Sequence, residues 1–485
     1  MTGIDFTEEN IQLIFGHEAA EDEAPERLKQ YFLRSTTYDQ VMAQLPLRIL
    51  VGHKGLGKSA LFQVAMSEDE NASRLALVVQ PNDIVGLAED SEDFLRTVRS
   101  WREGLLEILA RKAMSGLGLA QDATIADRLK SYGGRLTDFV LATVQDMKST
   151  SLDPAKKLVT ETFLKNREMS VYIDDLDRGW QGRKQDITRI SALLNAVRDI
   201  SNENRNIRFR VALRTDVYFL VRTSDESTDK IEGSVVWLKW TQQEIFALLA
   251  LRIESFFGAS LSSAQLLNSS QASLSRSLDR LFEPRFNGRG HWRGAPTHRV
   301  LMSLIRKRPR DLVKLCTLAA RDARLGGERV ITTKNLENIF EEYSQGRMQD
   351  TINEFRTELP AIERLLFGMK PNKKEKTAKA GYTYTTDGLI EKIKSIQEQG
   401  AFKFANRRPA TPKDLAAFLY KINFITARKD VGEVIDRKYF EESRYLQSNF
   451  VDFGYAWEIH PAYRWALQPD NIADIFLSLK LTSDG

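Results

Sequence analysis

The stretch "VGHKGLGKSALF", from Val51 to Phe62, follows an apolar run and holds three glycines before one lysine. Its pattern is G-x-x-x-x-G-K-[ST]. Glycines let the backbone curl until several N–H groups face one anion, and a helix that starts at the lysine adds its own positive end. The stretch therefore predicts a phosphate-binding loop, with Lys58 on the outer phosphates of a nucleotide and Ser59 on Mg²⁺. The residues expected to line it are Gly52, His53, Lys54, Gly55, Leu56, Gly57, Lys58, Ser59 and Ala60.

Strand-like and helical segments alternate around this loop. Short apolar, β-branched runs predict strands, and helical patterns lie between them. Phe94, Val98, Trp101, Leu105 and Ile108, for example, recur at three- and four-residue spacing on one helix face. Such alternation predicts a parallel sheet in a three-layer α/β core over residues 43–245. The expected strands are 47–51, 74–79, 170–176, 207–213 and 234–240.

A carboxylate directly after an apolar strand is the second part expected of a nucleotide site. In "SVYIDDLDRGW" the strand ends at Asp174 and Asp175. Ligands of open α/β sheets bind at the carboxyl ends of the strands. We therefore expect Asp174 to hold Mg²⁺ and Asp175 to orient or deprotonate an attacking water. Taken alone, two acids could simply end a strand, but the upstream loop favours the metal role.

Cations further along the chain are candidates for contacts with the γ-phosphate. The fourth strand ends in "ALRTDVYF", where Arg214 or Thr215 could contact it, and "RKRPRDLV" offers Arg310. A cation over the site would stabilise charge on a transferring phosphoryl group. The alternatives, a surface arginine at a strand end and a basic helix start, stay open for Arg214 and Arg310.

Beyond residue 245 the strand signals disappear and helices dominate. The sequence predicts a helical lid over 246–345 and a winged-helix-like α+β domain over 346–485, after an N-terminal segment, 1–42. The stretch 276–310 holds ten basic and two acidic residues, and "MKPNKKEKTAKAG" (369–381) reads as a mobile lysine-rich loop. In the last domain, Trp457, Tyr463 and Trp465 are expected in the core, and His460 as a structural hydrogen-bonding residue.

Composition excludes several classes of protein. The 485 residues carry 70 basic and 66 acidic side chains, a net charge of +4 that is too balanced for a general polyanion binder. Cys316 is the single cysteine, so no disulfide forms within the chain, and the five histidines show no zinc-finger spacing. The start lacks a signal-peptide pattern and no long apolar run occurs. We expect a cytoplasmic protein without a membrane span.

These motifs together resemble the STAND class of AAA+-related P-loop ATPases and its KAP relatives. The resemblance rests on "KGLGKSAL", "YIDDLDR" and "RPRDL", and extends to "FGHEAAEDE", "ALRTDVY", "WTQQEIFALLALRI" and "WEIHPAYRWAL". It implies that Lys58 and Ser59 hold phosphate and Mg²⁺, that Asp174 holds Mg²⁺, that Asp175 serves the water, and that Arg310 matches a lid arginine. Many KAP relatives insert membrane helices between the two nucleotide motifs, whereas this chain has soluble helices there. Many AAA+ enzymes place glutamate at the position of Asp175, so hydrolysis here is expected to be slow.

Two functions follow from these patterns. The first is an ATP- and Mg²⁺-dependent conformational switch that acts through oligomerisation or a separate effector protein; the resemblance adds a role in bacterial defence against phage. The alternative is a DNA-dependent AAA+-like ATPase that binds DNA through its basic lid and winged helix. A scaffold with a decayed nucleotide site is disfavoured by the complete loop. ATP is preferred over GTP because no N/T-K-x-D signature lies between 205 and 300.

Overall fold

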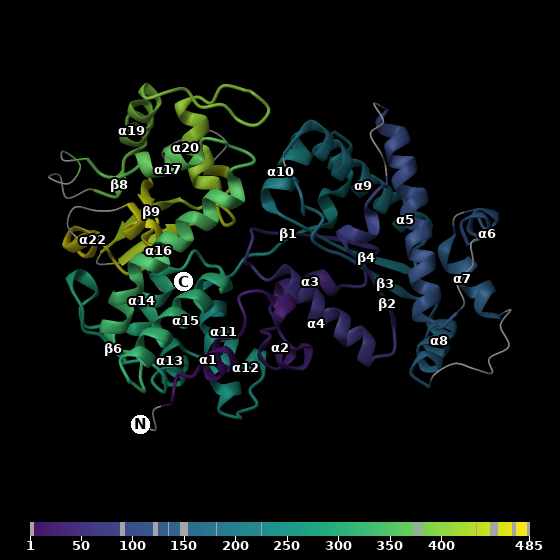
Figure 1. Ribbon diagram of the computed structural model, residues 1–485, viewed down its shortest axis with the longest axis horizontal. Coiled ribbons are helices and arrows are strands. Elements are labelled where there is room, and N and C mark those ends of the chain that lie inside the picture. The colour runs from purple at the N-terminus through teal and green to yellow at the C-terminus, as the bar shows by residue number, and fades with distance from the viewer. Residues whose placement is uncertain are drawn as a thin grey trace. The chain divides into compact units, whose positions relative to one another are not determined.

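A computed structural model describes residues 4–87, 93–119, 125–133, 135–145, 154–180, 182–224, 226–372, 375, 381–432, 434–446, 454–467 and 472–482. The chain packs as two compact units, 36–238 and 1–35 with 239–485 (Figure 1). The domain boundaries at 42, 245 and 345 that the sequence predicts stay a prediction. Most of the predicted lysine-rich loop, residues 373–374 and 376–380, lies outside the described residues.

The unit 36–238 is built on a five-stranded parallel sheet in the order β2-β3-β4-β1-β5. Helices connect the strands, so the predicted three-layer α/β class is confirmed. The strands are β1 (Leu47–Val51), β2 (Leu75–Val79), β3 (Met169–Ile173), β4 (Ile207–Leu213) and β5 (Val235–Trp237). The helices are α3 (Thr36–Met42), α4 (Lys58–Asn71), α5 (Phe94–Gly116), α6 (Ile125–Ser131), α7 (Leu136–Gln145), α8 (Pro154–Asn166), α9 (Lys184–Glu203) and α10 (Thr215–Ser224), with 3-10 turns η2 (Pro81–Ile84) and η3 (Glu226–Ser234).

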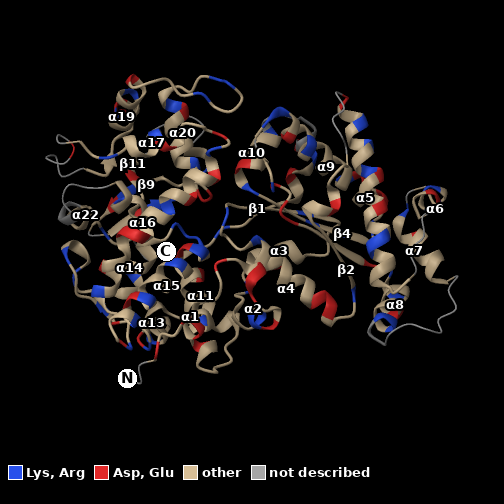
Figure 2. Ribbon diagram, viewed as in Figure 1, with Lys and Arg blue, Asp and Glu red and all other residues tan. Residues whose placement is uncertain are grey.

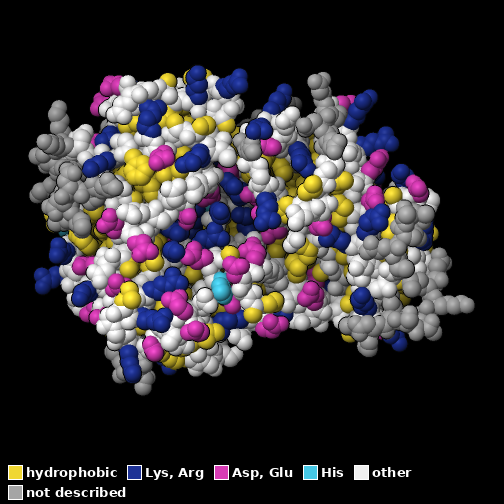
Figure 3. All heavy atoms as spheres, in the orientation of Figure 1, with side chains coloured by type: hydrophobic (Ala, Val, Ile, Leu, Met, Phe, Trp, Pro, Cys, Tyr) yellow, Lys and Arg dark blue, Asp and Glu magenta, His cyan; other side chains and the backbone are white. Residues whose placement is uncertain are grey.

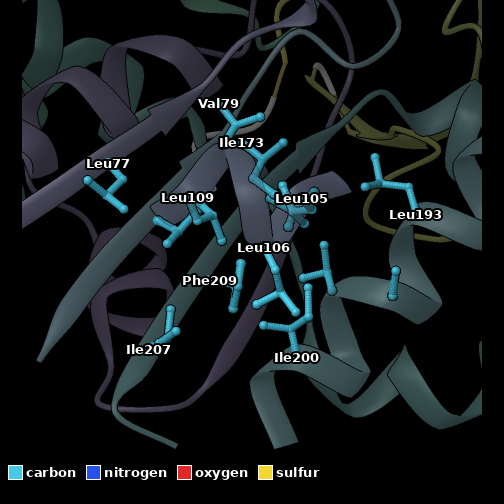
Figure 4. Close-up of a cluster of buried hydrophobic side chains, with 14 of the residues drawn as sticks. Leu77, Val79, Leu105, Leu106, Leu109, Ile173, Leu193, Ile200, Ile207 and Phe209 are labelled. Atoms are coloured by element: carbon cyan, nitrogen blue, oxygen red, sulfur yellow. The ribbon is translucent and has the colours of Figure 1, made fainter. Parts of the chain in front are cut away.

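The two faces of this sheet bury different side chains because direction alternates along a strand. On one face, residues such as Leu77, Val79 and Phe209 pack against Leu105 of α5 and Leu193 of α9 (Figure 4). On the other face, Tyr172 meets Phe62 of α4 edge to face at 5.5 Å. Strands buried on both faces are nearly continuous apolar runs, which is what made them visible in the sequence.

The second unit begins with residues 1–35 and continues from Lys239. Its first helix α1 (Glu8–Phe15) buries Ile11, Ile14 and Phe15 and packs against α11 (Gln242–Phe256) and α15 (Pro309–Leu325). Apolar residues three and four apart thus tie the N-terminal segment to the helical region. The other helical elements before residue 370 are η1 (Ala20–Asp22), α2 (Pro25–Tyr31), α12 (Ser263–Leu267), α13 (Gln271–Leu278), η4 (Gly290–Trp292), α14 (Thr297–Leu304), α16 (Thr333–Phe355) and α17 (Ile362–Gly368).

The C-terminal part of this unit is a winged-helix-like α+β arrangement. Two helices, α19 (Thr386–Glu398) and α20 (Pro412–Lys421), lie in the chain between the first strand and the other three strands of an antiparallel sheet, whose order is β10-β9-β11-β8. Its strands are β8 (Thr383–Tyr384), β9 (Ile425–Val431), β10 (Val434–Lys438) and β11 (Ala456–Ile459), followed by η5 (Pro461–Tyr463), η6 (Trp465–Leu467) and α22 (Ile472–Ser478). The predicted core residues Trp457, Tyr463 and Trp465 are all buried.

Candidate functional site

The glycine-rich loop lies between β1 and α4, as the sequence predicts. Gly55 and Gly57 adopt left-handed φ values of 83° and 93°, and Gly57 is the residue that caps α4. A Cβ on Gly52 would lie 3.0 Å from Leu56 Cδ1 and 3.2 Å from Leu238 Cβ. The loop therefore needs glycine at these positions, and successive left-handed turns of this kind form anion-binding concavities.

Lys58 lies at the first position of α4 with its ammonium group turned back onto the loop. Its Nζ donates to the carbonyl oxygens of Gly52, at 2.8 Å, and His53, at 3.3 Å. Ser59 and Ala60 follow in the first turn of the helix, where unpaired N–H groups give a partial positive charge. A fixed cation, a helix N-terminus and a glycine-built cradle fit the phosphates of a nucleotide.

Asp174 directly follows β3, at the same edge of the sheet as the loop. In the strand register Val51 lies beside Leu213, and Ile173 lies beside Val211, so β3 and β1 are separated by β4 alone. Two strand spacings correspond to about 10 Å, a span that a metal-bound phosphate chain can bridge. The Asp174 side chain is half-buried, and its Oδ1 accepts the N–H of Asp175 at 2.8 Å.

Asp175 has a φ of 58°, a left-handed conformation that few non-glycine residues adopt. The side chain is exposed and pairs with Arg178 at 3.5 Å. β3 ends at Ile173, three residues earlier than the sequence predicts, and the left-handed backbone of Asp175 follows directly after Asp174. Backbone strain of this kind clusters at functional sites.

Arg214 follows β4 and is held by two carboxylates. Its Nε and Nη2 donate to Asp216 at 3.0 and 2.6 Å, and its Nη1 donates to Asp177 at 3.2 Å. The two acids are 2% and 13% exposed, so the guanidinium links the segment after β3 to the start of α10. Thr215, the other candidate at this strand end, is fully buried, and its Oγ1 makes no hydrogen bond within the described part of the chain.

Asp177 and Asp216 are residues of this cluster that the sequence analysis did not single out. Both were visible in the quoted stretches, Asp177 in "YIDDLDR" and Asp216 in "ALRTDVY". The sequence feature that could have identified them is an acidic residue just past the end of each of two strands. Where two such strands are neighbours in a parallel sheet, both carboxylates lie at the same edge and can pair with an arginine there.

Arg310 belongs to the other unit, in the first turn of α15. Its Nε donates to the backbone carbonyl of Glu18 at 3.1 Å, and Lys314 pairs with the Glu18 carboxylate at 3.0 Å. The neighbouring Arg306 and Arg308 are buried and pair with Asp311 and Glu354. Of the "RKRPRDLV" cations, then, Arg310 and Lys307 stay partly exposed.

His460 is the structural residue that the sequence predicts. Its Nδ1 accepts the N–H of Ala462 at 3.1 Å, which leaves Nε2 to carry the proton toward Tyr439, 2.9 Å away. Burial, together with the charges of Arg437 and Arg306, holds the pKa of His460 well below its usual value. Among the described residues, no group of three or more metal-binding side chains stands together, and none of the described helices is long and apolar enough to span a membrane.

A parallel sheet with β4 between β1 and β3, a glycine loop that opens α4 and an aspartate after β3 define a three-layer α/β fold of the P-loop NTPase type. A family model described as the FunZ-associated C-terminal helical domain matches residues 244–352. The chain is also 22% identical over 452 residues to the putative transposon gamma-delta 80.3 kDa protein of Escherichia coli K12. That match covers 85% of this chain and 61% of the relative.

Two solved structures of the ORC2 protein of Aeropyrum pernix are also similar in outline. The ADPNP-ADP form matches with a TM-score of 0.39 at 11% identity, over 88% of this chain and 86% of that one. The ADP form matches with a TM-score of 0.34 at 11% identity, over 96% and 97%. A likeness at these TM-scores says nothing about function.

Proposed function

We propose that this chain binds Mg²⁺·ATP at the Gly52–Ala60 loop, hydrolyses it slowly and changes conformation with the bound nucleotide. One observation supports this most: the Lys58 ammonium is turned onto a loop whose Gly55 and Gly57 have left-handed φ values that favour glycine. The described residues at the carboxyl ends of β1 and β3 include a cation, Lys58, for the phosphates and a carboxylate, Asp174, for the magnesium ion. Nucleotide binding implies that Lys58 exchanges its two carbonyl acceptors for phosphate oxygens, which are stronger acceptors.

The roles of the remaining residues follow from their places at the sheet edge. Ser59 and Asp174 would hold Mg²⁺, which neutralises charge between the outer phosphates. Asp175 would orient the attacking water and accept its proton. Arg214 and Arg310 are proposed phosphate contacts, and each has a partner to release first: Asp177 for Arg214, and the Glu18 carbonyl for Arg310.

The proposed switch uses residues 43–245 to bind the nucleotide and residues 246–345 as a lid, with the N-terminal segment 1–42 and the domain 346–485 responding to it. Its output would be self-association or control of a separate effector protein. A place in bacterial defence against phage, in the cytoplasm, rests on the resemblance of the loop and strand motifs to the STAND and KAP-like class.

Calorimetric titration with ATP, ADP and GTP in the presence of Mg²⁺ tests the binding step. Lys58→Ala should abolish ATP binding. Lys165→Ala is the matched control, because Lys165 is an exposed lysine of the same unit that lies outside the loop. Equal affinity of both variants for ATP would refute the proposed site. Light scattering of the wild type with ATP and with ADP then measures whether assembly depends on the nucleotide.

A DNA-dependent ATPase is the second candidate function. The similarity to the Escherichia coli relative, a putative transposon protein, favours it, as does the excess of basic residues over 276–310. In this case duplex DNA should raise the rate of ATP hydrolysis, and the Lys58→Ala variant should lose the stimulated rate together with the basal one.

A further inference from the structure

A short hairpin in the helical region separates apolar and cationic side chains. It consists of β6 (Arg285–Phe286), the turn η4 (Gly290–Trp292) and β7 (Ala295–Pro296). Phe286 and Trp292 are completely buried. Four cationic or titratable side chains between them and beside them are exposed, namely Arg285, Arg289, His291 and Arg293. Figure 2 shows the corresponding blue segments on the loop at β6.

The hairpin is rigidly anchored. Phe286 and Trp292 pack edge to face at 6.2 Å, and both contact Phe340 of α16. A Cβ on Gly290, whose φ is 67°, would lie 2.3 Å from the Phe476 carbonyl oxygen, so the turn passes close to α22. Across the hairpin, Gly294 N–H donates to Phe286 O at 2.7 Å. Aromatic anchors thus fix the positions from which the arginines project.

Within the part of the chain that the structure describes, these arginines form no ion pair, although the Glu337 carboxylate lies beside Gly288 of the same turn. The nearest acid in sequence, Glu283, instead accepts the Thr333 N–H and hydroxyl, at 2.9 and 2.8 Å, and the Asn287 amide. Arg285 donates to a backbone carbonyl, that of Gly294, at 2.7 Å. Elsewhere, lysines and arginines lie among acids over the face drawn in Figure 3. Arg280, just before the hairpin, pairs with Glu254 at 3.2 Å.

The chemistry of such a surface favours a nucleic-acid backbone over a small anion. A single phosphate is usually held by a concave group of backbone N–H donors, whereas these side chains project from an open turn. Guanidinium groups on a fixed frame match phosphates repeated along a strand.

The predicted winged helix offers less contact surface. In α20, where a reading helix would be expected, Leu415, Ala416, Phe418, Leu419 and Tyr420 are buried. A helix that is largely buried in its own domain has few side chains left for a DNA groove.

We propose that the hairpin 285–296 binds the phosphate backbone of double-stranded DNA, with Arg285, Arg289 and Arg293 as the contacts. This inference deepens the second candidate function. It does not depend on ATP turnover, because all of its residues lie in the unit that lacks the glycine loop.

Fluorescence anisotropy with a 30-base-pair duplex, without nucleotide and at several salt concentrations, tests the proposal on the full chain. Each phosphate contact contributes about 0.9 to the slope of log K against log salt. Replacing Arg285, Arg289 and Arg293 by Gln should therefore make the slope less negative by about 2.7. Replacing the same three by Lys should keep the slope near that of the wild type, because the charges remain.

A matched control removes three exposed arginines that have carboxylate partners. Arg99, Arg321 and Arg356 pair with Glu103, Glu8 and Glu363 at 2.9, 2.8 and 3.5 Å. Their replacement by Gln changes net charge equally and should leave the salt slope almost unchanged. Equal slopes for the hairpin variant and the wild type would overturn the proposal. It would also be overturned if the wild type bound poly-glutamate but not the duplex, since the partner would then be an acidic protein.

Discussion

The buried carboxylate of Asp311 is a point at which one substitution should strongly destabilise the unit that contains residues 239–485. Asp311 is 1% exposed and accepts Nε and Nη2 of Arg306 at 2.7 and 2.8 Å. It also accepts the Arg306 backbone N–H at 3.2 Å and Nη1 of Arg347 at 2.9 Å. Both arginines are buried too. Asp311→Asn keeps the shape but leaves two buried guanidinium groups short of an anion, which costs about 3–5 kcal/mol.

Arg347 provides a matched control, because it also pairs with Asp350 at 3.0 Å, and that carboxylate side chain is 52% exposed. Asp350→Asn should cost about 0–1 kcal/mol, as surface pairs generally do. Hydrogen exchange of α16 peptides in increasing urea measures the unfolding free energy of this region separately from the other unit. The reasoning is refuted if the two variants are destabilised equally.

The same residue predicts a dependence on pH. Burial alone would raise the pKa of Asp311, but the charges and hydrogen bonds of Arg306 and Arg347 outweigh it and hold that pKa far below its usual value. The folded state therefore binds no proton here while the unfolded chain does below about pH 4. The stability that Asp311 contributes is present above that pH and is lost as the pH falls further. In the Asp311→Asn variant this acid-dependent part should be absent.

Three further substitutions test other buried polar contacts. Arg214→Met should destabilise the unit 36–238 by about 3 kcal/mol in urea unfolding, because Asp216 stays buried without its partner. As a control, Arg178→Met should change the unfolding free energy little, because the pair of Arg178 with Asp175 is exposed. Arg210→Met should cost about 1–3 kcal/mol and speed hydrogen exchange at α3, since Arg210 donates to the carbonyls of Ala43 and Leu45 in the segment that follows this helix. His460 is buried neutral, so the unfolding free energy should fall below pH 6.5 by up to about 1.4 kcal/mol per pH unit, and His460→Gln should lose that slope.

The core of the fold was predictable because its strands are buried on both faces. The run 47–51 became β1 with the predicted bounds, and 207–213 became β4. In β3 the sequence predicts three residues too many, since the strand ends at Ile173, before the left-handed Asp175. β5 is shorter than the predicted 234–240 and ends at Trp237.

The packing of the N-terminal segment was not predictable in the same way. The sequence predicts only an N-terminal segment, 1–42, yet its helix α1 contributes a buried face to the helical region. Its partners α11 and α15 lie more than 200 residues away in the sequence, and periodicity does not reveal which apolar stripe packs against another. The strands β8 and β10 were missed because they are short or rich in charged residues.

The glycine-rich loop lies between a strand and a helix as predicted, because its glycines and the helix start at Lys58 are local features of the sequence, whereas phosphate binding by this loop stays a prediction. The partners of Arg214 depend on two strand ends that meet only in the folded sheet. Contacts between strand ends that are distant in the sequence decide whether an arginine faces a nucleotide or a carboxylate. The spacing of residues within a motif does not predict these contacts.

Steady-state ATP hydrolysis by the Asp175→Asn variant tests the central claim most directly. Asparagine tolerates the left-handed backbone at this position and removes only the negative charge. If Asp175 serves the attacking water, turnover should fall by about 10²–10⁴-fold, while calorimetric affinity for Mg²⁺·ATP stays near that of the wild type. Asp175→Asn turnover equal to that of the wild type, or hydrolysis that survives Lys58→Ala, would contradict the account.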